Sequence, residues 1–295
     1  MEKQVIAIVG QTATGKSQLG ITLAKKFHGV IVSADSRQVY RGLDIGSGKV
    51  SKREQRATPH YLLDVADPRR TYTVAQYVHA ARKAIHKMHQ RGQTPILVGG
   101  TGFWIDALLL GTSIPAVPPN PRLRKRLGKR TAAALFAQLQ RLDSRRAKNI
   151  DRHNPIRLIR ALEIVLTTKK PVPAATTEQR YDVLWLGLQQ PIQKLRVAIH
   201  TRLRRRLRTG MVAEVRKLLQ RGVPAKRLFN LGLEYRYVTR FLQRELTREE
   251  MFEQLENAIV QYAKRQRTWF ARNHNIHWVK NTREATALVR NFLKT

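Results

Sequence analysis

The chain has 295 residues, of which 42% are hydrophobic, and this suits one large domain, or one core with a small second domain, around a buried interior. It has no cysteine and no apolar run near the ~20 residues of a membrane span, which excludes a disulfide framework, a thiolate metal site and a transmembrane helix. Its 56 Lys and Arg residues against 20 Asp and Glu residues give a net charge of +36, which indicates a polyanionic partner, most commonly nucleic acid. The alternatives are a solvated basic surface and weak association with acidic membranes.

The first predicted elements are a strand, a glycine-bounded loop and a helix. The apolar run 5–9 precedes Gly10-Gln11-Thr12-Ala13-Thr14-Gly15-Lys16-Ser17, and an amphipathic stretch follows at once. A P-loop needs this order, because backbone N–H groups of the loop and of the helix N-terminus surround a phosphate and Lys16 adds a point charge. Ser17 can place its hydroxyl on a phosphate-bound Mg²⁺. The motif predicts a phosphate site without identifying the phosphate compound.

A second buried parallel strand is predicted at 30–32, and the polar run Ser33–Gln38 follows it. Polar residues beyond the carboxyl end of such a strand lie where open α/β sheets bind ligands. Asp35 is therefore a candidate for the reacting centre, with capping of the next turn as its alternative role. Residues 40–49 are glycine-rich and predict a loop near the site.

A helix over 73–90 opens with a capping box, and a buried strand is predicted at 95–98. The strand leads into Gly99-Gly100-Thr101-Gly102, where two glycines permit close approach of the backbone to a ligand. Thr101 could hydrogen-bond a phosphate or a base there. The alternative is a tight turn with a capping threonine.

The composition changes at Thr112. Four prolines lie within 115–121, and many Lys and Arg residues follow, so we interpret 112–180 as a basic helical insertion. Its last helix is predicted to turn Ile156, Ile159 and Val165 inward, with Arg157 and Arg160 on other parts of its surface.

After the insertion the chain returns to the main sheet. The remaining predicted elements are a strand at 181–187, a long arginine-rich helix over 195–219 that breaks at Gly210, a polar loop at 231–235, a helix over 251–270, a strand at 276–279 and a capped terminal helix. The predicted fold is α/β, with a P-loop parallel-sheet core formed by 1–111 and 181–295 and an inserted helical domain at 112–180.

Seven motifs stand in a recognisable order along nearly the whole chain. They are Gly10–Ser17, Ser33–Tyr40, Ile45–Lys49, Pro59-His60, Val98–Gly102, Arg157 with Arg160–Glu163, and Ala263-Lys264-Arg265-Gln266 with Thr268-Trp269. Together they resemble the tRNA dimethylallyltransferase family. The sequence departs from the family pattern at Ser47, Val50, Val260 and Arg206, and the last departure leaves the diphosphate-binding arginine open within 196–208.

The resemblance implies a P-loop core with a helical insertion that grips the anticodon stem-loop of tRNA. It implies transfer of a dimethylallyl group from dimethylallyl diphosphate to N6 of the adenosine just 3′ of the anticodon. The lack of a signal-peptide pattern and of a membrane span predicts a cytoplasmic protein with no membrane partner, and we expect a monomer. Asp35 is similar to the family's general base and Thr101 to its catalytic threonine. The residues that would hold the diphosphate, with Mg²⁺ on Ser17, are Gly10, Gln11, Thr12, Ala13, Thr14, Gly15, Lys16, Ser17 and Arg202. Those that would contact tRNA are Asp35, Ser36, Arg37, Gln38, Arg157, Arg160, Lys264, Arg265 and Gln266.

Two other functions use some of the same residues. A P-loop kinase of a nucleoside or small metabolite could use Asp35 as base, with Asp64, at the end of a short strand predicted at 59–65, holding the metal. A non-catalytic RNA-binding ATPase or chaperone is the second. The basic insertion argues against the kinase, and the order of the motifs argues against both.

Overall fold

The computed structural model describes residues 3–174 and 176–294. The chain divides into two compact units, one formed by Met1–Gly111 with Gln179–Thr295 and the other by Thr112–Glu178. The second unit ends at Glu178, against a predicted boundary at 180.

The first unit contains a six-stranded parallel sheet with the strand order β3-β2-β4-β1-β5-β6, so the predicted α/β class is confirmed. The strands are β1 (Gln4–Gly10), β2 (Gly29–Ala34), β3 (His60–Tyr61), β4 (Thr94–Gly99), β5 (Asp182–Leu188) and β6 (Ile276–Trp278). Because β4 lies between β1 and β2, the carboxyl ends of these three strands are neighbours, and the segments that follow them meet at one edge of the sheet.

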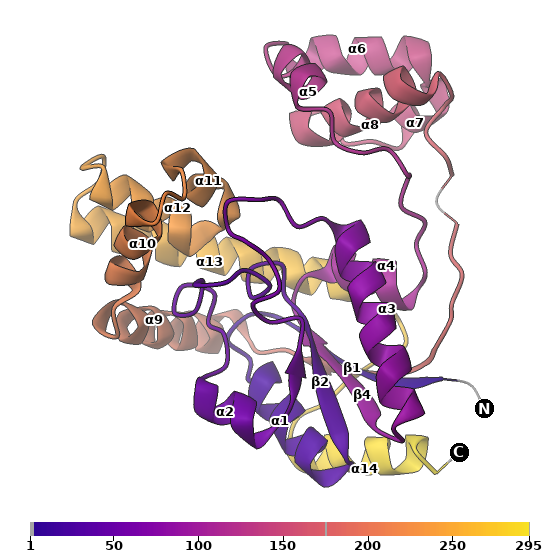
Figure 1. The fold of residues 1–295 in the computed structure, drawn as a ribbon, viewed down its shortest axis with the longest axis vertical. Coiled ribbons are helices and arrows are strands. Elements are labelled where there is room, and N and C mark those ends of the chain that lie inside the picture. Colours follow the sequence, from indigo (N-terminus) through magenta and orange to yellow (C-terminus); the bar gives the residue numbers. More distant parts are fainter. Residues whose placement is uncertain (1–2, 175, 295) are drawn as a thin grey trace. The chain divides into compact units, whose positions relative to one another are not determined.

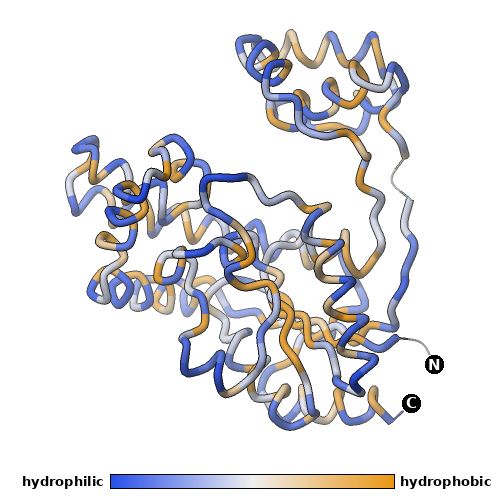
Figure 2. Tube along the Cα trace, viewed as in Figure 1, coloured by the Kyte–Doolittle hydropathy of each residue, from blue (hydrophilic) through white to orange (hydrophobic). Residues whose placement is uncertain are grey.

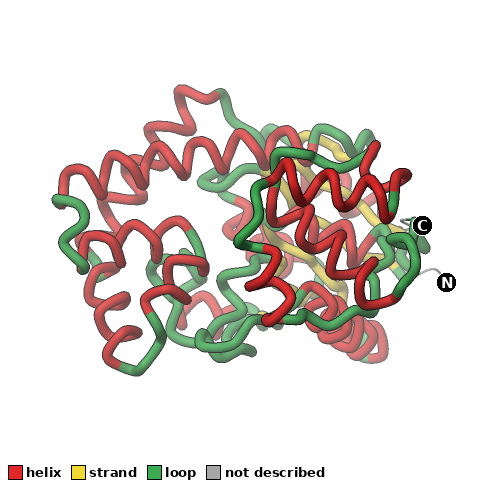
Figure 3. The backbone as a smooth tube through the Cα atoms, turned by 90° about the horizontal axis from the view of Figure 1, so that it is seen from above, coloured by secondary structure: helices red, strands yellow, loops and turns green. Residues whose placement is uncertain are grey.

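The helices of the first unit are α1 (Lys16–Lys26), α2 (Lys52–Ala57), α3 (Val74–Gln90), α4 (Gly102–Leu109), α9 (Ile192–Arg208), α10 (Met211–Gln220), α11 (Ala225–Leu231), α12 (Leu233–Leu242), α13 (Arg248–Phe270) and α14 (Thr282–Phe292). Helices of this unit cover both faces of the sheet, while α10, α11 and α12 form a group away from the strands (Figures 1 and 3). The hydrophobic colouring of Figure 2 is concentrated on the strands, as expected when both faces of a parallel sheet are covered.

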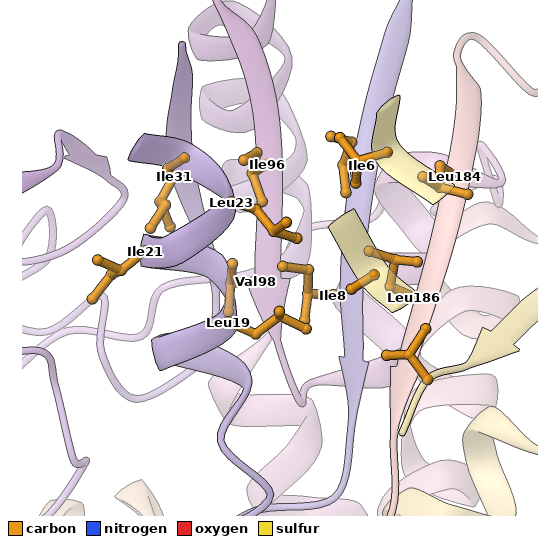
Figure 4. Close-up of a cluster of buried hydrophobic side chains, with 14 residues drawn as sticks. Ile6, Ile8, Leu19, Ile21, Leu23, Ile31, Ile96, Val98, Leu184 and Leu186 are labelled. Carbon is orange, nitrogen blue, oxygen red and sulfur yellow. The ribbon is translucent and has the colours of Figure 1, made fainter. Parts of the chain in front are cut away.

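One core cluster fixes the strand and the helix on either side of the P-loop. Leu19 and Leu23 of α1 pack on Ile8 of β1 and on Val98 of β4 (Figure 4). Complete burial of one such side chain stabilises the fold by about 1.5–3 kcal/mol. The phosphate loop is therefore held between two rigid elements.

Two predictions for the arginine-rich region had different outcomes. The predicted break at Gly210 is confirmed, because α9 ends at Arg208 and α10 begins at Met211. The polar loop predicted at 231–235 is wrong, because only Gly232 lies between α11 and α12. Leu231 and Tyr235 are buried, and burial of these two large side chains favours helix over the loop that the polar neighbours suggested.

The second unit is a small helical domain. Its helices are α5 (Pro121–Leu127), α6 (Ala132–Leu142), α7 (Ser144–Lys148) and α8 (Pro155–Thr168). The prediction that Ile156 turns inward is wrong, since its side chain is 79% exposed. Leu158, Leu162 and Val165 recur at helical spacing and form the buried face, and Ile156 falls outside that stripe.

A buried carboxylate stands inside this second unit. Glu163 is fully buried and accepts hydrogen bonds from Arg124 Nε (2.8 Å) and Nη2 (2.7 Å), Arg160 Nη1 (2.6 Å) and the Asn120 backbone N–H (2.7 Å). Burial alone would raise its pKa, but these donors hold the pKa of Glu163 at about 2. A depressed carboxyl pKa stabilises the folded state above the ordinary value of 4.5 and ceases to do so as the pH falls toward 2.

Glu163→Gln is expected to lower the free energy of unfolding of the second unit by about 2–3 kcal/mol, because it leaves two guanidinium groups without their anion. The arginines are themselves partly exposed, so the cost lies below that of a fully buried pair. Hydrogen exchange of the α6 and α8 amides in the full chain measures this loss in the free energy of unfolding, with the β1 amides as internal control. Unchanged protection in α6 and α8 would contradict this account of Glu163.

Candidate active site

A cavity of about 910 Å³ lies in the first unit, where the segments after β1, β2 and β4 meet. The residues predicted for the site that line it are Thr12, Ala13, Thr14, Gly15, Lys16, Ser17, Asp35, Ser36, Arg37, Gln38, Thr101, Arg202, Arg265 and Gln266. Gly10 ends β1 beside it, Gln11 is buried beneath the loop, and Lys264 is exposed on α13. Arg157 and Arg160 belong to the second unit.

Two side chains of the P-loop donate hydrogen bonds to a backbone carbonyl of the same loop. Lys16 Nζ donates to the Gln11 carbonyl (2.5 Å), and Thr14 Oγ1 donates to the same oxygen (2.8 Å). The Gln11 side chain accepts from the Gln190 backbone N–H (3.1 Å), which ties the loop to the segment after β5. The first turn of α1 carries no acidic residue, so the N-terminus of that helix is free to favour an anion.

Gln266 bridges two backbone segments of the site. Its Oε1 accepts from the Thr12 N–H (2.7 Å), and its Nε2 donates to the Gly100 carbonyl (2.9 Å). A Cβ on Gly100 would lie 2.2 Å from that Nε2, so any larger residue at position 100 would displace the Gln266 amide. Both ends of the Gln266 amide thus hold the site together, and the RNA contact that the sequence predicted for Gln266 stays a prediction.

Asp35 caps the turn after β2 and also lines the cavity. Its Oδ1 accepts from the backbone N–H groups of Arg37 (2.8 Å) and Gln38 (3.4 Å), which caps the turn after β2. Within the described ranges 3–174 and 176–294, no residue donates a hydrogen bond to its Oδ2. One carboxylate oxygen thus fixes the side chain, and the other is available beside the cavity.

Thr101 does not cap the helix that it precedes. Its Oγ1 accepts instead from the Ser36 N–H (3.1 Å), and its own N–H donates to the Ala34 carbonyl (3.2 Å). This joins the end of β4 to the turn that carries Asp35. The capping alternative for Thr101 is therefore wrong.

The arginine that reaches the P-loop is Arg202, whose Nη2 donates to Thr12 Oγ1 (2.6 Å). Burial, and after it the charge of Arg206, lower the pKa of Arg202 to about 10, so it stays charged at neutral pH. Arg205 and Arg206 also line the cavity, but Arg206 Nη1 is turned to the Gly46 carbonyl (3.1 Å) and to Glu234 (3.1 Å).

Sequence reasoning missed the partner of Arg206. Leu195, Ile199, Leu203 and Arg206 form the buried face of α9, so the arginine occupies a position of apolar periodicity. A buried guanidinium needs a carboxylate, and that requirement was the signal that could have pointed to Glu234.

Asp64 does not serve the cavity. Its carboxylate accepts from Lys49 Nζ (2.6 Å), which also binds Asp44 (2.6 Å). No group of three or more His, Asp or Glu residues in the described part of the chain could hold a metal by itself. The carboxylate that the kinase alternative needs for its metal is therefore engaged elsewhere.

Lys16 has an unusual proton affinity. Burial, and next the charge of Arg202, lower the pKa of Lys16 to about 7, although the Asp35 carboxylate opposes the shift. A bound polyanion favours the ammonium form. At a pH above about 7, anion binding should therefore be accompanied by proton uptake.

We expect binding of an organic diphosphate to be accompanied by uptake of close to one proton at about pH 8 and of almost none at about pH 6, because only above pH 7 is Lys16 neutral beforehand. The dissociation constant should accordingly rise with pH above 7. Calorimetric titration in two buffers of different ionisation enthalpy counts the protons. Equal uptake at both pH values would show that Lys16 is not the group involved.

The chain from Gln38 to Asn273 matches the family model described as IPP transferase. The chain belongs to the IPP transferase family. It is 41% identical over 282 residues to the tRNA dimethylallyltransferase of Thermomicrobium roseum, covering 94% of this chain and 86% of that protein. It is 41% identical over 286 residues to the enzyme of the same name from Acaryochloris marina, covering 96% and 94%.

Solved structures of IPP transferase relatives share the fold. The tRNA isopentenylpyrophosphate transferase of Bacillus halodurans is 31% identical, covers 99% of this chain and 96% of its own, and superposes with a TM-score of 0.74. A eukaryotic dimethylallyltransferase crystallised while acting on tRNA is 24% identical, with a TM-score of 0.83 over 99% of this chain and 79% of its own. No helix in the described part of the chain combines the length and apolar character that a membrane span requires.

Proposed function

We propose that this member of the IPP transferase family transfers the dimethylallyl group of dimethylallyl diphosphate to N6 of the adenosine 3′ of the anticodon in tRNA. The observation that carries the proposal is the placement of Asp35, Lys16 and Arg202 around one cavity. The cavity would thus combine a general base with an anion-binding site, in a chain with a net charge of +36. Cytoplasmic location and a monomeric state stay predictions.

The acceptor needs a base. The lone pair of the exocyclic adenine amine is delocalised into the ring, so the nitrogen attacks well only if its proton is removed as the C–N bond forms. The free Oδ2 of Asp35 is the acceptor for that proton, and such catalysis contributes about 10²–10⁴-fold. The Asp35 side chain is held for this by the hydrogen bonds to its other oxygen.

The leaving group needs positive charge. Diphosphate gathers negative charge as the allylic C–O bond breaks, and the P-loop N–H groups, Lys16 and Arg202 would stabilise it. The Ser17 hydroxyl would hold Mg²⁺ together with the phosphate oxygens, and the ion would neutralise part of the charge on the leaving diphosphate. Mg²⁺ needs few protein ligands when it binds a diphosphate, which suits a cavity where Ser17 stands without an acidic cluster among the described residues.

The RNA must present an everted base. Extruding a nucleotide costs a few kcal/mol, and less in a loop than in a duplex. Phosphate contacts of basic residues would offset that cost. In the insertion, Arg157 is exposed for this role, whereas Arg160 is engaged with Glu163 and with the Val117 carbonyl (3.0 Å).

The test is incubation of the purified protein with tRNA, Mg²⁺ and dimethylallyl diphosphate, followed by nuclease digestion and mass spectrometry of the nucleosides. We expect N6-(dimethylallyl)adenosine. Phosphoryl transfer from ATP to a small molecule without RNA would favour the kinase instead. Tight RNA binding with no prenylated nucleoside would favour the chaperone.

A further inference from the structure

The loop that follows Leu43 is held from outside by one carboxylate. Glu214 of α10 accepts three successive backbone N–H groups, from Asp44 (2.9 Å), Ile45 (2.7 Å) and Gly46 (3.0 Å). Its Oε1 also accepts from the Tyr235 hydroxyl (3.0 Å), and that hydroxyl oxygen accepts in turn from the Ser47 N–H (3.1 Å). Two side chains of α10 and α12 thus satisfy every N–H of residues 44–47.

The next residue of the loop is fixed as tightly. Gly48 has φ +63°, and a Cβ there would lie 1.7 Å from Arg206 Nη2. Arg206 also donates to the Gly46 carbonyl (3.1 Å). Within the loop, the Gly48 N–H donates to the Ile45 carbonyl (3.1 Å) and the Lys49 N–H to the Asp44 carbonyl (3.0 Å), so the peptide that carries the Gly48 carbonyl is tied to the residues that Glu214 holds.

This carbonyl orients Gln38. Gln38 Nε2 donates to the Gly48 carbonyl (3.3 Å), and Gln38 Oε1 accepts from Ser33 Oγ (3.1 Å). A carbonyl oxygen can only accept, so the amide nitrogen must face Gly48. One N–H and one oxygen lone pair of Gln38 remain for a ligand, in a fixed orientation beside the cavity.

The remaining N–H donor and oxygen acceptor of Gln38 match adenine and not guanine. Glutamine binds adenine with two hydrogen bonds, one donated to a ring nitrogen and one accepted from the N6 amine. Guanine has an acceptor oxygen where adenine has this amine, so it would oppose the Gln38 Oε1 lone pair. On the Watson–Crick edge guanine pairs its O6 acceptor with an N1–H donor, the reverse of adenine, so a Gln38 amide free to turn over would accept either base there.

We infer that Glu214 is a positioning residue for base selection: through residues 44–48 it fixes the amide of Gln38 and so favours adenine over guanine. The inference rests on the proposed function, and it adds a residue of α10 to the recognition of the acceptor. In Glu214→Gln, the amide NH₂ would oppose backbone N–H groups and free the loop.

The test uses the full chain and two anticodon stem-loop RNAs that differ only by adenosine or guanosine at the target position. We expect the wild-type protein to bind the guanosine RNA at least about tenfold more weakly, and Glu214→Gln to bring the ratio of the two dissociation constants near unity. Tyr235→Phe should shift the ratio in the same direction. Glu253→Gln, which removes the same charge from an exposed position on α13, should leave it unchanged.

Two further measurements distinguish an effect of Glu214 on base selection through Gln38 from a merely structural role of Glu214. In a Gln38→Ala background, Glu214→Gln should not change the ratio further, because the effect acts through Gln38. The dissociation constant of dimethylallyl diphosphate should stay within about twofold, since that site has its own supports in Gln266 and Arg202.

The inference is overturned if Glu214→Gln keeps the wild-type ratio, or if it lowers the ratio equally with Gln38 absent. If Glu214→Gln fails to fold, an unchanged ratio in Tyr235→Phe overturns it. Absence of prenyl transfer to the adenosine RNA by the wild-type chain would instead refute the proposed function, whatever the ratio.

Discussion

Asp35→Asn is expected to lower the rate of prenyl transfer by about 10²–10⁴-fold while the dissociation constant for tRNA changes little. Asparagine keeps an oxygen for the N–H groups of Arg37 and Gln38, so the turn after β2 should retain its shape. It cannot take the N6 proton. Single-turnover transfer at saturating tRNA and donor measures the chemical step apart from binding.

The control for this variant is Asp182→Asn, which removes an equal charge at the amino end of β5, the opposite edge of the sheet from the cavity. Its transfer rate should equal that of the wild type. If Asp35→Asn transfers as fast as Asp182→Asn, the proton leaves to another group and the role of Asp35 reduces to capping.

The strand-end positions of the catalytic candidates were predictable from sequence. Apolar runs followed by Gly-rich or polar segments placed Lys16, Asp35 and Thr101 at carboxyl ends of parallel strands, and a parallel sheet brings such ends to one edge. The order of strands was not predictable, because it depends on pairing between segments far apart in the chain.

The supports of the site were harder to predict. Glu214 looks like an ordinary polar position of an amphipathic helix, and Glu234 falls in the segment predicted as a polar loop. Their partners Gly46 and Arg206 are distant in sequence. Local patterns report which side of a helix is buried, not which backbone group a buried carboxylate will meet. Ile156 shows the same limit. Its hydrophobic side chain was predicted to face inward, but it lies in the first turn of α8 and is exposed.

Arg202→Gln is expected to lower kcat/KM for dimethylallyl diphosphate by about 10²–10³-fold, the usual effect of losing one donor to a developing oxyanion. Among the arginines of 196–208, a range that the structure describes throughout, Arg202 is the one with a hydrogen bond to the P-loop, through Thr12 Oγ1, and it is therefore the residue chosen for substitution. Glutamine keeps a hydrogen-bond donor for Thr12 and removes the charge. Steady-state kinetics with the donor varied at saturating RNA measures the loss.

The matched control is Arg204→Gln on the same helix, where the side chain is exposed and lies outside the cavity lining. Its kcat/KM for the donor should stay within about twofold of wild type, since charges screened by water contribute little. The comparison is sharp because both variants remove one charge from α9. Equal losses in the two would mean that the general field of this helix, rather than a contact at Thr12, stabilises the leaving diphosphate.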